Sequence, residues 1–88
     1  MIELGGSEMT KVIIRLPSVE EVKDFVSTIS SCDCEIDIAA DRYIVDAKSI
    51  MGIFSLDLSK PLELRIISDE ENVIADVLDK IGRFIVSE

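Results

Sequence analysis

Histidine and tryptophan are absent from this 88-residue sequence, and cysteine occurs only at positions 32 and 34. Zinc sites normally need four Cys, His or carboxylate ligands, so a lone Cys-x-Cys pair is weak evidence for a metal site. Glycine-rich phosphate loops and Ser/His/Asp or Cys/His sets are also missing. We therefore expect no metal, no cofactor and no enzymatic site. We interpret Cys32 and Cys34 as small apolar side chains on one face of a strand.

Long apolar runs are absent as well. Charged residues interrupt the apolar ones every few positions, so nothing approaches the roughly 18–20 apolar residues of a membrane-spanning helix. Residues 1–10 have neither a basic start nor a long apolar segment, and so indicate no signal peptide. These absences predict a cytoplasmic protein that does not insert into membranes.

Basic residues are scarce. Nine Lys and Arg residues face eighteen Asp and Glu residues, which gives a formal net charge of −9. Such a charge repels nucleic acids and disfavours anionic membrane surfaces. A basic protein, or one with an arginine-lined pocket, is the natural electrostatic partner.

The length indicates one small domain. Residues 1–10 contain two glycines and show no periodicity, so we expect a loose N-terminal arm, followed by a single domain over residues 11–88. Apolar and polar residues alternate, or β-branched residues cluster, in four segments that we predict to be strands. These segments are 11–16, 32–38, 42–47 and 62–67.

Three helices are predicted between and after these strands. Ser18-Val19-Glu20-Glu21 and Ser68-Asp69-Glu70-Glu71 both match the capping box that opens a helix. The first helix should reach Ser30, with an inner face of Val19, Val22, Phe25, Val26 and Ile29. The last should reach Ile85, with Gly82 inside it and an inner face of Val73, Ile74, Val77, Leu78, Ile81 and Ile85. The resulting βαββαβα order predicts an α+β open-faced two-layer sandwich, a four-stranded antiparallel sheet covered on one face by three helices.

The middle helix is the most informative segment. Ser49 is a favoured N-cap residue, and we expect the helix to run from there to about Leu58. Too many large apolar residues follow Ser49 for one face of a short helix, so some of them must point outward. Because soluble monomers rarely leave such groups exposed, we predict a protein-docking surface made by Ile50, Met51 and Phe54.

The same segment carries a family resemblance. Lys48-Ser49-Ile50-Met51-Gly52, followed by Ser55-Leu56, resembles the second-helix motif of HPr, the phosphocarrier protein of the bacterial phosphotransferase system. The resemblance implies the HPr fold over about residues 11–85. It also implies that Ser49 stands at the family's regulatory phosphorylation site and that the apolar residues after it form the surface on which partner proteins dock. A plain N-cap and a capped core helix are the structural alternatives.

The resemblance fails at the phosphoacceptor. In the family a histidine before the first helix carries the phosphate, and counting back from Ser49 without gaps places Ser18 there. Glu20 and Glu21 stand where the resemblance places an arginine and a proline. A serine ester transfers phosphate onward much less readily than phosphohistidine, and serine needs a neighbouring base to act as a nucleophile. The capping-box interpretation accounts for Ser18 and Glu21 without any catalysis.

Three functions remain open at this point. The first is an HPr-like binding or regulatory module that has lost histidine phosphotransfer and binds proteins through the second helix. The second is a phosphocarrier component with an atypical acceptor. The third is a structural domain that forms a homodimer through the same apolar surface.

Overall fold

Four antiparallel strands form one sheet in the computed structural model, which describes residues 9–86. The strands are β1 (Met9–Ile14), β2 (Glu35–Ala40), β3 (Tyr43–Asp46) and β4 (Leu62–Ile67), in the order β1-β4-β2-β3. The helices are α1 (Val19–Ile29), α2 (Ile50–Phe54) and α3 (Glu71–Lys80), and a 3₁₀ turn, η1, spans Gly82–Phe84. The order and sheet type confirm the predicted α+β sandwich.

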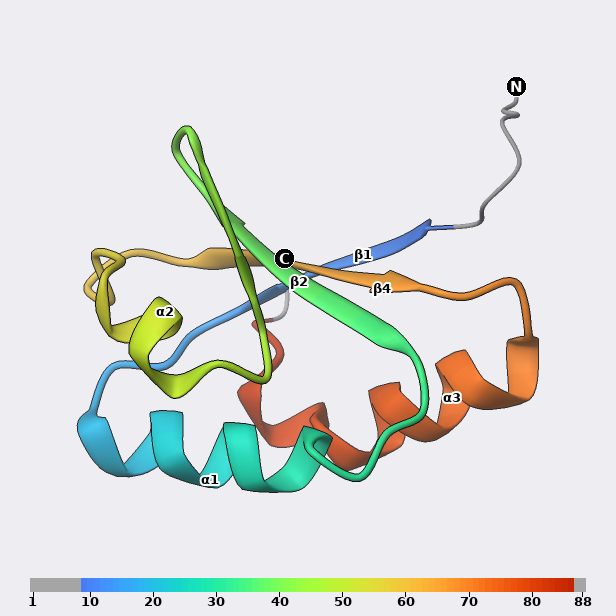
Figure 1. Ribbon diagram of the computed structural model, residues 1–88. Helices are drawn as coiled ribbons and strands as arrows, with labels where there is room; N and C mark the ends of the chain where they lie inside the picture. The colour runs from blue at the N-terminus through green and yellow to red at the C-terminus, as the bar shows by residue number, and fades with distance from the viewer. Residues whose placement is uncertain (1–8, 87–88) are drawn as a thin grey trace.

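All three helices lie on the same side of the sheet (Figure 1). Alternate residues of each strand point to opposite faces, and those that face the helices form the core. On β4 these residues are Leu62, Leu64 and Ile66, each at most 1% exposed. Ile36 and Ile38 of β2 are equally buried beside them. No helix in the described part of the chain is long and apolar enough to cross a membrane.

Helix α1 starts as predicted but buries a narrower face. Ser18 is the N-cap, and Val22, Phe25 and Ile29 are fully buried. Val19, predicted on the inner face, is 55% exposed, and that prediction is wrong. Val19 is the first residue of the helix, so little of the protein covers it.

The C-terminal region differs most from expectation. Helix α3 begins at Glu71 with Glu70 as N-cap, so the predicted capping box at Ser68 is wrong. The Ser68 hydroxyl instead accepts a hydrogen bond from the Glu70 N–H (3.1 Å). The helix ends at Lys80 rather than Ile85, and Gly82 begins η1.

This earlier helix end lets the chain return to the sheet. The backbone N–H of Arg15 donates to the Phe84 carbonyl (3.0 Å), and Val86 N–H donates to the Ile13 carbonyl (2.8 Å). Ile85 forms an isolated bridge with Ile14. These long-range bonds replace the helical hydrogen bonds that the sequence pattern predicted.

Several strand and helix boundaries also shift. Strand β1 starts at Met9, so the last two residues of the predicted arm belong to the sheet; residues 1–8 lie outside the described part. Strand β2 starts at Glu35, so Cys32 and Cys34 precede it and the strand prediction for them is wrong. Helix α2 stops at Phe54 rather than near Leu58.

Phe84 should be a major contributor to stability. Its ring packs edge-on against Phe25, with centroids 5.5 Å apart, and it is 4% exposed. We expect Phe84→Ala to lower the free energy of unfolding by about 3–5 kcal/mol, because it removes buried apolar area and leaves a cavity. Urea unfolding followed by circular dichroism measures the change. Phe54→Ala is the matched control: Phe54 is 37% exposed, and its loss should be clearly smaller.

Candidate functional site

Ser18 acts as a helix cap in the folded chain. Its Oγ accepts a hydrogen bond from the Glu21 N–H (3.2 Å), and its carbonyl accepts one from Val22 N–H (3.1 Å). The return hydrogen bond from Ser18 N–H to the Glu21 carboxylate is not formed among the described residues, so only half of the predicted capping box is present. The hydroxyl oxygen therefore has a structural partner at the helix start.

The charges near Ser18 are mostly negative. Glu20 and Glu21 occupy the first turn of α1, where carboxylates interact favourably with the positive end of the helix dipole. The nearby cation Arg15 uses its Nη2 to donate to the Ser59 carbonyl (3.1 Å), which ties the chain before α1 to the loop after α2. Sequence reasoning missed this link, because the two residues are 44 positions apart.

Ser49 is the N-cap of α2, as predicted. Its Oγ accepts from Gly52 N–H (3.2 Å), and its carbonyl accepts from Ile53 N–H (3.1 Å). A Cβ on Gly52 would lie 3.3 Å from both the Ser49 Oγ and the Val45 Cβ, so glycine permits this close packing. The Lys48 ammonium donates a hydrogen bond to the Cys32 carbonyl (2.6 Å) rather than to Ser49.

The apolar residues of α2 divide between core and surface. Ile53 is fully buried and Ile50 is half-buried against the core. Met51 is 74% exposed and Phe54 is 37% exposed. Of the three predicted docking residues, the structure thus leaves Met51 and Phe54 at the surface and places Ile50 at the boundary with the core.

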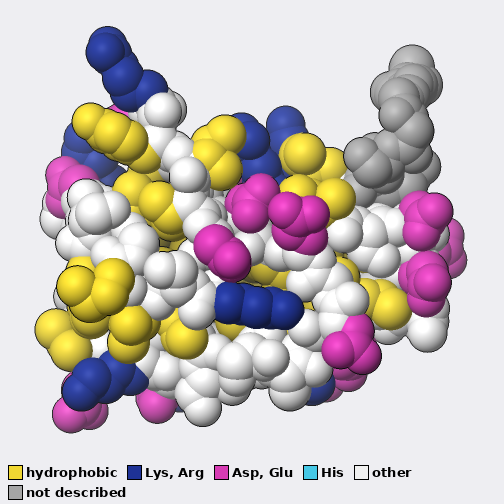
Figure 2. Space-filling view, in the orientation of Figure 1, with side chains coloured by type: hydrophobic (Ala, Val, Ile, Leu, Met, Phe, Trp, Pro, Cys, Tyr) yellow, Lys and Arg dark blue, Asp and Glu magenta, His cyan; other side chains and the backbone are white. Residues whose placement is uncertain are grey.

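Figure 2 shows hydrophobic side chains gathered over α2 and the adjacent N-terminal end of α1. Val19 opens α1 and is 55% exposed. Sequence reasoning had assigned Val19 to the core, although its place directly after the cap was a signal that it could be exposed. We refer to Ile50, Met51 and Phe54 together as the α2 surface.

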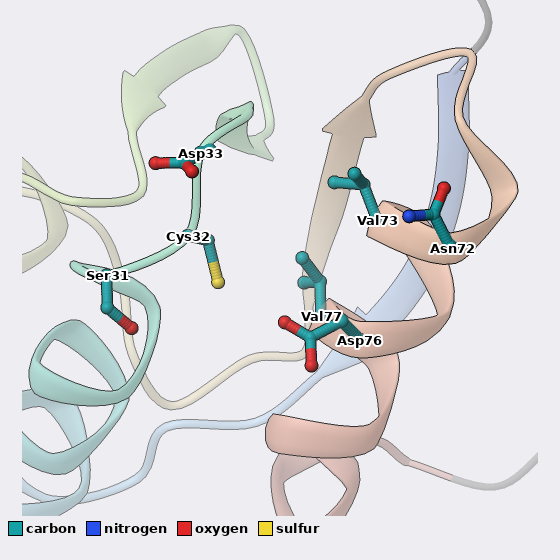
Figure 3. Close-up of a pocket in the computed structure, with 7 residues that line it drawn as sticks. All are labelled: Ser31, Cys32, Asp33, Asn72, Val73, Asp76 and Val77. Carbon is teal, nitrogen blue, oxygen red and sulfur yellow. The ribbon is translucent and has the colours of Figure 1, made fainter.

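A separate hollow of about 370 Å³ lies between α3 and the segment after α1 (Figure 3). In Figure 3 the Cys32 sulfur and the side chains of Val73 and Val77 point into it, with Asp76 at its rim. Burial, with a smaller contribution from Cys32, raises the pKa of the nearby Cys34 thiol, so this thiol is a poor nucleophile. No group of three or more His, Cys, Asp or Glu residues in the described part could hold a metal ion. The hollow therefore offers no recognisable chemistry.

Comparison with known proteins now places the chain in a family. The family model described as "PTS HPr component phosphorylation site" matches residues 21–87. The chain belongs to the HPr family of phosphotransferase-system phosphocarriers. A solved structure, HPr-C-His from Thermoanaerobacter tengcongensis, is 30% identical, with a TM-score of 0.63. The alignment covers 85% of this chain and 96% of that one. A search of curated protein sequences finds no match.

This HPr family membership confirms the resemblance carried by the second-helix motif. The matched segment starts three residues after Ser18, so the correspondence of Ser18 with the family's phosphoacceptor stays a prediction. Proteins of the HPr family are phosphocarriers rather than enzymes. This chain's sequence contains no histidine.

The cap role of Ser18 has a measurable consequence. Ser18→Ala should lower the free energy of unfolding by about 1 kcal/mol, because the Glu21 N–H loses its acceptor. Ser27→Ala is the matched control, since Ser27 is an exposed residue within the same helix. Urea unfolding should show little change for Ser27→Ala. Equal losses in the two variants would contradict the cap role.

Proposed function

We propose that this chain is a protein-binding module of the HPr family that has lost histidine phosphotransfer. Its partner docks on the α2 surface. The observation that carries the proposal is the exposure of Met51. This residue is 74% exposed, whereas Ile53 on the same five-residue helix is fully buried. An unbranched, polarisable methionine at the surface suits contact with partners of varied shape.

Loss of phosphotransfer is supported by the residues at the start of α1. The sequence has no histidine to form a phosphoramidate. Ser18 Oγ already accepts from the Glu21 N–H, and Glu20 and Glu21 would repel an attached phosphate. The nearby Arg15 is bonded to the Ser59 carbonyl instead. This combination serves helix capping better than phosphate transfer.

The charge of the chain supports a partner of particular chemistry. At −9 the molecule attracts cationic surfaces and repels anionic ones. We propose a partner protein with an apolar groove for Met51 and Phe54, edged by Lys or Arg side chains. Apolar anchors supply most of the affinity in such interfaces, and complementary charge mainly speeds association.

Ser49 belongs to this proposal as a site where phosphorylation would regulate docking. It is half-buried and lies two residues before Met51. A phosphate there would add negative charge at the edge of the α2 surface. The N-cap hydrogen bond to Gly52 N–H explains the serine structurally as well, so the regulatory role rests on the family resemblance.

Docking through α2 can be tested with the full chain as bait in its own lysate. Met51→Asp should reduce the recovery of bound partner at least about tenfold, because a charge replaces an apolar anchor at the interface. Phe54→Asp should act in the same direction. Met51 is so exposed that Met51→Asp should change the free energy of unfolding by no more than about 0.5 kcal/mol.

Tyr43→Asp serves as the matched control for docking. Tyr43 is 63% exposed but lies on β3, at the hairpin that projects away from α2 (Figure 1). The Tyr43→Asp variant should therefore recover as much bound partner as the wild type. If folded Met51→Asp and Phe54→Asp proteins recover the same partners as the wild type, the α2 surface is not the docking site.

Phosphotransfer is tested directly with enzyme I and labelled phosphoenolpyruvate. We expect no acid-labile label on this chain, whereas an HPr that contains the acceptor histidine, run in parallel, should be labelled. Label that survives acid and disappears in Ser18→Ala would show a serine acceptor and support the phosphocarrier alternative. Acid-labile label on the wild type would equally contradict the proposed loss.

A further inference from the structure

One row of residues on the sheet face opposite the helices carries charges that are sorted by strand. The pairing register aligns Lys11 of β1, Arg65 of β4, Asp37 of β2 and Asp46 of β3 in one row. Their strand neighbours, such as Leu64 and Ile38, point to the helix side and are buried, so this row points to the uncovered face. In this row the two cations lie on β1 and β4 and the two carboxylates lie on β2 and β3. The neighbouring rows add Glu63 and Glu35 to the same face.

Two of the three cross-strand pairs in this row are unfavourable within one molecule, whereas the middle pair, Arg65 and Asp37, carries opposite charges. Like charges stand directly opposite each other at Lys11 and Arg65 and again at Asp37 and Asp46, which destabilises a sheet. Arg65 bonds to Glu63 of its own strand, Nε to Oε2 at 2.7 Å. Lys11 and Asp46, at the two ends of the row, form no ion pair with any described residue. Asp46 Oδ1 accepts a hydrogen bond from the Lys48 N–H (2.9 Å), which is a neutral donor.

The next row along the strands places apolar residues at the same two edges. It consists of Ile13 on β1, Glu63 on β4, Ala39 on β2 and Ile44 on β3. Ile44 is 60% exposed, which is unusual for a large apolar side chain on a sheet. Figure 2 shows apolar, basic and acidic groups together along the upper side of the molecule, which is the sheet side in Figure 1.

We propose that this uncovered sheet face, defined by these two rows, binds a second copy of the same chain. A two-fold axis parallel to the strands, between β4 and β2, places β1 of one copy over β3 of the other. Lys11 then faces Asp46 of the second copy, Arg65 faces its Asp37, and Ile13 faces its Ile44. Sheets packed in this way lie about 10 Å apart with their strands nearly aligned, within reach of these side chains.

Charge complementarity selects the second copy as the occupant. A row that is basic on β1 and β4 and acidic on β2 and β3 is matched by a row in the reverse order, and rotation about this axis supplies one automatically. Pairing through the β3 edge is less suitable, because the Asp46 carbonyl already accepts the Ser49 N–H (3.0 Å). The interface is independent of the α2 surface, which lies on the helix side.

The size of the face sets the strength of the dimer. The face is four strands wide, at about 4.8 Å per strand, and about six residues long, at about 3.3 Å per residue. Its area is therefore about 400 Å². Stable interfaces bury about 800 Å² on each partner, so this contact belongs to the weak class. The dimer should therefore form only at high concentration and should weaken as salt screens the charges.

Sedimentation velocity of the full chain over a concentration series tests the proposal. The average mass should rise from the monomer value toward twice that value as the concentration approaches about 1 mM, the weak end of the affinity scale. Lys11→Glu and Asp46→Lys should each weaken association about tenfold, because each places like charges opposite one another across the interface. The double variant Lys11→Glu/Asp46→Lys reverses the pair and should recover association to within about threefold of the wild type.

Matched variants on β3 separate this interface from other contacts. Ile44→Lys should weaken association, whereas Tyr43→Lys should not, because Tyr43 is equally exposed but points to the opposite face. Met51→Asp should leave association unchanged, because Met51 lies on the helix side. If Met51→Asp weakened association, the dimer would form through the α2 surface instead. A wild type that remains monomeric throughout, a double variant without recovery, or equal effects of Ile44→Lys and Tyr43→Lys would overturn the proposal.

Discussion

The pairing of β4 between β1 and β2 is the constraint on which the remaining structure depends. Leu64 of β4 lies opposite Val12 on one side and Ile38 on the other, so segments distant in sequence share one buried layer. Because β4 separates β1 from β2, the connection through α1 must pass across the layer rather than form a hairpin. This crossing holds α1 against the helix side of the sheet, with its first turn next to α2 (Figure 1).

That arrangement explains why α2 has both a buried and an exposed apolar side. The helix has only five residues, and Ile53 fills the space toward the sheet. Met51 has no described element above it and remains at the surface. Gly52 keeps the helix close to β3, where Val45 approaches. A short helix near the corner of a small two-layer domain thus presents apolar groups without loss of core packing.

Membership in the HPr family defines the scaffold more firmly than the chemistry, since one fold supports different functions through the residues at its sites. In this chain the start of α1 is organised around the Ser18 cap and the acidic first turn. Those features stabilise the helix, because a side-chain oxygen and nearby carboxylates both interact with its unpaired N–H groups. The same helix start can therefore remain structurally sound without a phosphate acceptor.

The sequence by itself determined the order of elements, the start of α1 and α2, and the uneven distribution of apolar residues after Ser49. These features depend on local periodicity and on caps within three or four residues. Tertiary structure decided where α3 ends, because Phe84 and Val86 form hydrogen bonds with the segment around β1, about 70 residues away. It also decided that Val19 is exposed and that Cys32 and Cys34 precede β2. Finally, the row of Lys11, Arg65, Asp37 and Asp46 exists only through strand register, because no local pattern brings four separate segments side by side.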